Sequence, residues 1–330
     1  MENGSKLSGL RLVIYLFGAV CALVLLLICA VSLGWFTGSG RVEGYAETLT
    51  ADNGVFELAA ADKNGNYDSL MIVPEGEIIN GVIAEDGAEI SLTATSDAKP
   101  AIKWLMNDES NFGNLTDDGI QPGSSGRLTF YVIARQDIDL KLTFRLDKIL
   151  YDSAAEPISA LHPDNSEHII PKTETAARLA DGHILFFRQY DEASGVYSER
   201  ITDSFTFTQL NAAANTAYRV DFYWVWPLFV DQLVLPADDA LLRARGYDRL
   251  IVSGQSVITQ EDDTAYFAES IQDLAVMLDN LAKGSNDSGF DSGYYELLNA
   301  KWNEADQIIG TNAGYIELLL TAELGSKDTP

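Results

Sequence analysis

A run of apolar residues near the start of the sequence, Leu12 to Phe36, contains no charged side chain. At 1.5 Å of rise per residue, a helix over this run exceeds the roughly 20 residues that cross a bilayer core. A cleavable signal peptide usually has a shorter apolar centre of about 7–15 residues, yet the small residues of Ala30-Val31-Ser32 and Ser32-Leu33-Gly34 suit a signal peptidase. The run therefore predicts an N-terminal transmembrane or signal helix over residues 12–36, and retention and cleavage both stay open.

The charges on either side of this run predict its orientation. Lys6 and Arg11 precede it, and basic flanks stay on the cytoplasmic side, so we expect residues 1–11 in the cytoplasm. The chain has 22 basic and 49 acidic residues, of which residues 1–40 hold two basic and one acidic. The remaining 20 basic and 48 acidic residues give a net charge of −28 after residue 40. Such a surface repels nucleic acid and anionic lipid head groups. The sequence thus predicts a cell-membrane protein with an extracellular C-terminal domain, or one secreted to the cell surface after cleavage, with the membrane and a signal peptidase as partners and no nucleic acid.

Both cysteines, Cys21 and Cys29, lie inside the apolar run. The exported part therefore has no thiol, and disulfide-stapled secreted scaffolds are excluded. An exported domain without cysteine fits a bacterium with a single membrane better than a eukaryotic secretory route.

Several later segments alternate between apolar and polar residues, as a half-buried strand does. In IDLKLTFRLD, Ile138 to Asp147, the even-numbered apolar residues share one face and Asp139, Lys141, Thr143 and Arg145 share the other. The segment GRLTFYVIAR, 126–135, precedes it, and the short connection Gln136-Asp137 predicts an antiparallel hairpin. Similar segments are VFELAAA (55–61), SLMIVP (69–74), AEISLTATS (88–96), HILFFRQY (183–190), SFTFTQL (204–210), YRVDFYWVWP (218–227) and GYIELLLTAEL (314–324).

Helical spacing is found only late in the chain. Apolar residues from Ala268 to Leu281 follow it, after a cap at Asp263-Thr264 and before a stop at Lys283-Gly284, and a second helix runs from Tyr295 to a stop at Gly310. Many strands with two late helices predict a mainly β fold: an antiparallel β-sandwich over 53–330 with a C-terminal helical insertion at 237–310. Residues 37–52 form a linker or arm before it, and the polar stretch 154–181 is expected to be a long loop.

The stretch DKNGNYDS places Asp62, Asn64, Asn66 and Asp68 at alternate positions, a spacing that can bring oxygen ligands around one calcium ion. An EF-hand loop, however, has glycine at its sixth position and glutamate at its twelfth, where this chain has Tyr67 and Val73. We favour a plain hairpin between 55–61 and 69–74 with a type I′ turn at Asn64-Gly65, and the calcium loop is the alternative. Calcium is the one cofactor that the sequence suggests, with these four residues as a weak candidate site.

No arrangement in the exported part is typical of an enzyme. The three histidines, His162, His168 and His183, form no H-E-x-x-H pattern, and neither a G-x-S-x-G elbow nor a phosphate loop is present. We therefore expect no catalytic residues. Two more acidic loops are interpreted as solvated tips, with weak cation binding as the alternative: Asp108, Glu109, Asp117, Asp118, Asp287 and Asp291. The aromatic FYWVWP segment could stack sugars, but its alternation favours the core.

Two zones of the chain resemble a known group. The basic start, the apolar run ending in SLGWF and the following VFELAAA resemble exported Gram-positive proteins whose signal peptides are cut by the SipW-type signal peptidase, the group of camelysin and the fibre protein TasA. The later YWVWP and WNEADQIIGTNAGYIELLLTAE resemble clostridial surface proteins of that kind. The resemblance implies a jelly-roll sandwich in a biofilm matrix or cell envelope, and it transfers no active-site residue. No protease motif here matches the activity attributed to camelysin.

Together these features predict a non-enzymatic structural protein of the cell surface or extracellular matrix. The alternative is a surface ligand-binding module or hydrolase that uses acidic loops and a divalent cation. Self-association would use the arm of residues 37–52 as an added strand, but the net charge opposes it, so we expect a monomer.

Overall fold

The computed structural model describes residues 55–61, 71–72, 77–95, 101–106, 120–154, 166–234, 251, 256–259, 263–283 and 287–325. All of these belong to one compact unit, Gly54–Pro330. The predicted helix at 12–36 and the arm at 37–52 lie outside the described residues, so both stay predictions. Within the ranges above, no helix combines the length and the apolar character that a membrane span requires.

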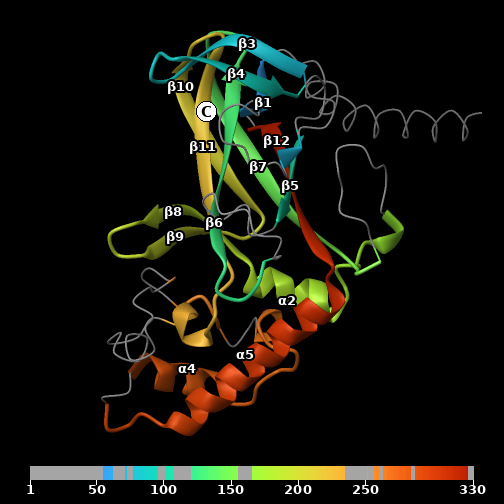
Figure 1. The fold of residues 1–330 in the computed structure, drawn as a ribbon. Helices are drawn as coiled ribbons and strands as arrows, with labels where there is room; N and C mark the ends of the chain where they lie inside the picture. Colours follow the sequence, from blue (N-terminus) through green and yellow to red (C-terminus); the bar gives the residue numbers. More distant parts are fainter. Residues whose placement is uncertain are drawn as a thin grey trace, which may run out of the picture. The chain divides into compact units, whose positions relative to one another are not determined.

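The larger of two sheets has seven strands in the order β3-β4-β1-β6-β11-β8-β9 (Figure 1). Neighbours in this order pair antiparallel. β3 also pairs with β11 in parallel, so that β3, β4, β1, β6 and β11 close into a small barrel around a separate apolar cluster. The strand bounds are β1 Phe56–Ala61, β3 Glu77–Ala84, β4 Glu89–Ala94, β6 Ser125–Ala134, β8 Leu185–Asp191, β9 Val196–Ile201 and β11 Thr216–Val225.

The second sheet has five strands in the order β10-β7-β12-β5-β2, all antiparallel. Its centre is the long pair of β7 and β12, which stay in register from Tyr151 opposite Tyr315 to Leu142 opposite Leu324. The strand bounds are β2 Met71–Ile72, β5 Ala101–Met106, β7 Ile138–Tyr151, β10 Ser204–Ala212 and β12 Tyr315–Leu324. With twelve strands and few helices among the described residues, the mainly β prediction is confirmed.

The main core contains side chains from both sheets. Aromatic rings meet across it: Phe130 of β6 contacts Phe144 of β7 at 5.0 Å between ring centroids, and Trp104 of β5 contacts Phe222 of β11 at 5.7 Å. Such edge-to-face pairs add to the stabilisation from buried apolar area. In β7 the alternation predicted from sequence is confirmed, because Leu140, Leu142 and Phe144 are buried while Asp139, Lys141 and Arg145 on the opposite face are exposed.

Two predicted hairpins are wrong. β6 and β7 follow one another closely in the chain, yet β6 pairs with β1 and β11 while β7 pairs with β10 and β12. The chain therefore crosses from one sheet to the other here, so that the apolar faces of both strands meet in the core. In the same way β1 and β2 belong to different sheets, which overturns the plain hairpin predicted for residues 55–74.

The helices differ in part from the sequence expectation. α5, Ser292–Asn312, agrees with the second predicted helix, although Gly310 lies inside its last turn. α4 begins only at Leu274 and ends at Lys283; Asp263, expected as its cap, instead starts the short 3-10 helix η4, Asp263–Ala265, and accepts hydrogen bonds from Ser270 and Ile271. The predicted loop at 154–181 contains η2, Ser166–His168, and the first part of α2, Thr175–His183.

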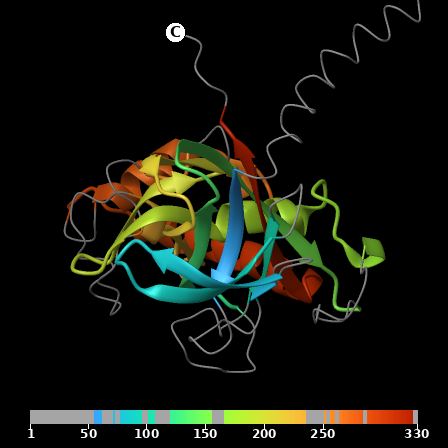
Figure 2. The same ribbon diagram turned by 90° about the horizontal axis from the view of Figure 1, so that it is seen from above.

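Helices α2, α4 and α5 gather at one end of the sheets (Figure 1), and a view from the end at which β3 and β4 lie shows them behind the strands (Figure 2). A second apolar cluster joins α4, α5 and η3, Val230–Leu233, to strands β8, β9 and β11. α5 also contributes Ala305 and Ile309 to the main core. This helix therefore connects the two cores, and the polar groups described next lie along it.

Candidate functional site

The predicted calcium ligands Asp62, Asn64, Asn66 and Asp68 lie outside the described residues, so the calcium prediction stays open. The same holds for His162 and for the acidic residues Asp108, Glu109, Asp117 and Asp118. In the part of the chain that the structure describes, no three His, Cys, Asp or Glu side chains come together as metal ligands would.

The remaining acidic loop forms local turns. Asp287 accepts a hydrogen bond from the backbone N–H of Gly289 at 2.7 Å, and Asp291 accepts one from Gly293 at 2.8 Å at the start of α5. The second is an N-cap, which satisfies a backbone donor that the helix itself leaves unpaired. Both residues are exposed, as a solvated loop tip requires.

His168 and His183, the two described histidines, have different environments. His168 is partly exposed in η2, where its ring nitrogens lie 3.3 Å from Asp152 and 3.6 Å from Glu167. His183 is the last residue of α2 and is completely buried. Only His183 belongs to an extended polar network, so the site is built around it.

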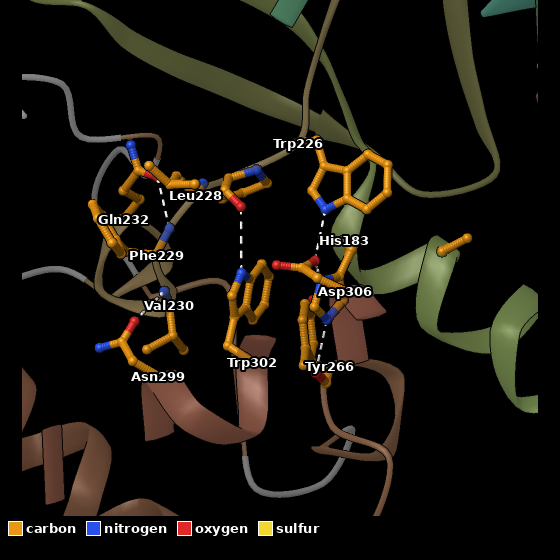
Figure 3. Close-up of polar contacts among 12 residues, drawn as sticks. His183, Trp226, Leu228, Phe229, Val230, Gln232, Tyr266, Asn299, Trp302 and Asp306 are labelled. Atoms are coloured by element: carbon orange, nitrogen blue, oxygen red, sulfur yellow. Dashed lines mark hydrogen bonds and ion pairs between the residues drawn. The ribbon is translucent and has the colours of Figure 1, made fainter. Parts of the chain in front are cut away.

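We call this network the polar seam: His183, Trp226, Tyr266, Trp302 and Asp306 (Figure 3). His183 Nδ1 lies 2.6 Å from Asp306 Oδ1, and His183 Nε2 lies 2.8 Å from the backbone oxygen of Tyr266. The indole N–H of Trp226 donates to the same Asp306 oxygen at 2.8 Å. The imidazole ring stacks on Trp302 with ring centroids 3.6 Å apart. The seam thus joins α2, the end of β11, the segment after η4, and α5.

Further hydrogen bonds attach α5 to the segment that follows β11. Trp302 Nε1 donates to the backbone oxygen of Pro227 at 3.3 Å, and Asn299 Oδ1 accepts from the backbone N–H of Val230 at the same distance (Figure 3). Gln232 accepts from the backbone N–H groups of Leu228 and Phe229. Buried polar groups of this kind stabilise a fold when each has a partner.

The seam is unsuited to general acid–base catalysis. An Asp–His pair acts as a base when the second ring nitrogen can reach a substrate. Here that nitrogen, Nε2, is already bonded to a backbone oxygen, and the ring is enclosed. The geometry therefore indicates a role in holding the helices against the sheets.

Lys148 provides a second polar connection between α2 and the sheets. Its ammonium group lies 3.0 Å from the backbone oxygens of Ala180 and Ile184 at the end of α2, and 3.0 Å from Asp181 Oδ1. The backbone oxygens at the end of a helix carry partial negative charge and attract a cation, and the Ala180 oxygen also accepts the Ile184 N–H at 3.0 Å. Burial lowers the pKa of the Lys148 ammonium below its usual value, and the nearby Asp181 carboxylate partly opposes this.

We expect Lys148→Met to destabilise the folded chain by about 1–3 kcal/mol, because it removes the hydrogen bonds of the Lys148 ammonium to two backbone oxygens at the end of α2. Urea unfolding of residues 41–330 followed by circular dichroism measures this. Lys172→Met is the matched control, since Lys172 is exposed and pairs with Asp147 at the surface; its cost should stay below about 1 kcal/mol. Equal losses in the two variants would contradict the role given to Lys148.

The pH dependence gives a second check on Lys148. Folding lowers its pKa, so the unfolded chain binds more protons than the folded chain between that lowered pKa and about pH 10.4, where an unfolded lysine deprotonates. The stability of the wild type relative to Lys148→Met should therefore increase as the pH rises toward that value. A relative stability that decreases over this range would contradict the lowered pKa.

Sequence reasoning noted His183 but missed its partner, which is 123 positions away. One pattern could have found it: Asp306 lies four residues after Trp302 and three before Ile309, on the apolar stripe of α5, where an acid is out of place unless it is paired. The prediction that the FYWVWP segment belongs to the core is confirmed, since Trp224 and Trp226 are buried.

Comparison with known proteins identified no relative. No protein-family model matches the chain. No curated protein and no solved structure matches it either.

Proposed function

We propose that this chain is a non-enzymatic structural protein of the cell surface or extracellular matrix of a Gram-positive bacterium. The observation that carries the proposal is the charge-free run from Leu12 to Phe36, with Lys6 and Arg11 before it and a net charge of −28 after residue 40. A run of this length and flanking charge directs the following domain outward, whether it is then retained or cleaved near Gly34.

The domain itself is proposed to be a jelly-roll-like β-sandwich. Strands β1-β6-β11-β8 of one sheet and strands β5-β12-β7-β10 of the other all contribute side chains to the main core. The chain passes repeatedly from one set to the other, for example from β6 to β7 and from β10 to β11. Eight strands in two layers with such crossings are typical of a jelly roll. The domain lacks cysteine, so a large apolar core, rather than disulfides, must provide its stability.

Export can be tested on intact cells. We expect added protease to cleave the chain beyond residue 40, and mass spectrometry of the mature protein to find either an intact apolar run or a new N-terminus close to Gly34. A cytoplasmic protein of similar abundance serves as the control for cell lysis. A chain that stays protected until the cells are broken would overturn the proposal.

The cation-dependent binding module or hydrolase remains a second candidate, favoured by the alternating oxygen side chains from Asp62 to Asp68. A ligand that binds the native state raises its stability by mass action. If the structural role is right, calorimetry of residues 41–330 should give the same unfolding midpoint from micromolar to millimolar calcium. A midpoint that rises with calcium, and no longer rises in Asp62→Asn/Asp68→Asn, would favour the second candidate.

A further inference from the structure

Hydrogen-bond geometry in the polar seam determines how many protons it holds. The backbone oxygen of Tyr266 can only accept, so His183 Nε2 must donate to it. On the other side of the ring, His183 Nδ1 and Asp306 Oδ1 are 2.6 Å apart, and that oxygen already accepts from Trp226. Two lone pairs would repel one another at this distance, so a proton must lie between the nitrogen and the oxygen.

The pair therefore holds two protons, one on Nε2 and one between Nδ1 and Asp306 Oδ1. This count is the same for an imidazolium beside a carboxylate and for a neutral imidazole beside a carboxylic acid. The stacking on Trp302 favours the first form, since an aromatic face attracts a cation. In an unfolded chain at pH 7.5 the same two side chains hold only one proton, because histidine there loses its second proton near pH 6.5 and aspartate near pH 3.9, in rough values.

We propose that the proton shared by His183 and Asp306 holds α5 against α2 and the end of β11, and that alkaline pH breaks this contact by removing the proton. We call this pair the latch. Removal of that proton would leave the two lone pairs facing each other in a buried part of the fold. The contact that joins the four segments of the seam would then become repulsive.

The other charged groups near His183 have partners of their own, so Asp306 is the acid that shares this proton with His183. On α2, Asp181 pairs with Lys148 and Arg178 donates to the backbone oxygen of Thr264. Near η4, Asp263 accepts from Ser270 and Ile271, and Arg200 of β9 donates to the Tyr266 hydroxyl. On α5, Lys301 pairs with Glu304. Of the charged side chains described on these elements, Asp306 is the one with a hydrogen bond to the His183 ring.

The sign of the pH effect follows from the proton count. Above about pH 6.5 the folded pair binds one proton more than the unfolded pair, so stability falls as the pH rises. One extra bound proton changes the unfolding equilibrium constant tenfold per pH unit.

The test compares the full chain in detergent micelles with His183→Gln and with the control His168→Gln, by denaturant unfolding between pH 6.5 and 8.5. We expect the wild type and His168→Gln to lose stability with rising pH, and His183→Gln to show a slope smaller by about one proton, a tenfold difference per pH unit. Glutamine at position 183 can still donate one hydrogen bond but binds no proton. Slopes that agree between His183→Gln and the wild type would overturn the latch.

A second measurement covers the case in which His183→Gln does not fold. Nitrogen NMR of histidine-labelled wild-type chain, with His162→Gln and His168→Gln to assign the signals, reports the protonation of each ring nitrogen. At pH 7.5 we expect His183 to carry a proton on Nε2 and a shared or full proton on Nδ1. A bare, unprotonated Nδ1 on a folded chain would overturn the proposal.

Discussion

Phe144→Asp should unfold the region Gly54–Pro330. Phe144 is completely buried in β7, and its ring lies 5.0 Å from the rings of Phe130 and Phe205. The substitution removes an aromatic side chain from the main core and places a carboxylate there without a partner. The combined cost is comparable to the whole stability of a domain, about 5–15 kcal/mol. Thermal unfolding by circular dichroism should show no cooperative transition.

The matched control is the next residue, Arg145→Asp. Arg145 lies on the opposite face of β7, with 64% of its side chain exposed, and it pairs with Glu323 only at 3.7 Å. Loss of this surface ion pair, with a new acid in its place, should cost no more than about 1 kcal/mol. If the two variants melt alike, the assignment of the buried and exposed faces of β7 is wrong.

Gly182→Ala should be the most damaging conservative change in the helices. A Cβ atom on Gly182 of α2 would lie 2.6 Å from the carbonyl carbon of Ala265 and closer still to its oxygen. These are backbone atoms, so α2 and η4 must move apart, and the movement also displaces His183 from the polar seam. We expect a loss of about 3 kcal/mol, measured by urea unfolding.

Gly310→Ala, also within a helix, should have the opposite effect on stability. Gly310 lies in the last turn of α5, and a Cβ atom there would meet no atom within 4 Å. Alanine should therefore stabilise the chain by up to about 1 kcal/mol, through its higher helix propensity. If both glycine variants gained stability, the close packing between α2 and η4 would be contradicted.

Which residues are buried could be predicted well from the sequence. The alternation in β7, β11 and β12 identified their core faces, and the spacing of Tyr295, Leu298, Trp302, Ala305 and Ile309 identified the buried stripe of α5. The reason is local geometry: side chains alternate along a strand and repeat every 3.6 residues along a helix, whatever partner covers them.

Short or less regular elements were not predicted, because the prediction depended on local periodicity. β3, β5 and β9 were not predicted, and α2 was assigned to a loop. α4 begins six residues after Ala268, the first residue of the predicted helical pattern. The same apolar spacing is found just before α4, where Ile271 packs on the same apolar cluster although its segment is not helical. Periodicity alone does not separate a helix from an irregular segment buried on one side.

The sequence by itself determined the charge-free run, the absence of cysteine after residue 29, the mainly β character and the buried faces of the long strands. Only the tertiary structure decided that β6 and β7 lie in different sheets, and that His183 meets Asp306. The alternation of a strand shows which face is buried but not which strand pairs with it. A hairpin and a crossing to the other sheet both bury the same face. Pairing between residues 123 positions apart depends on how all the layers pack together, and no local pattern contains that information.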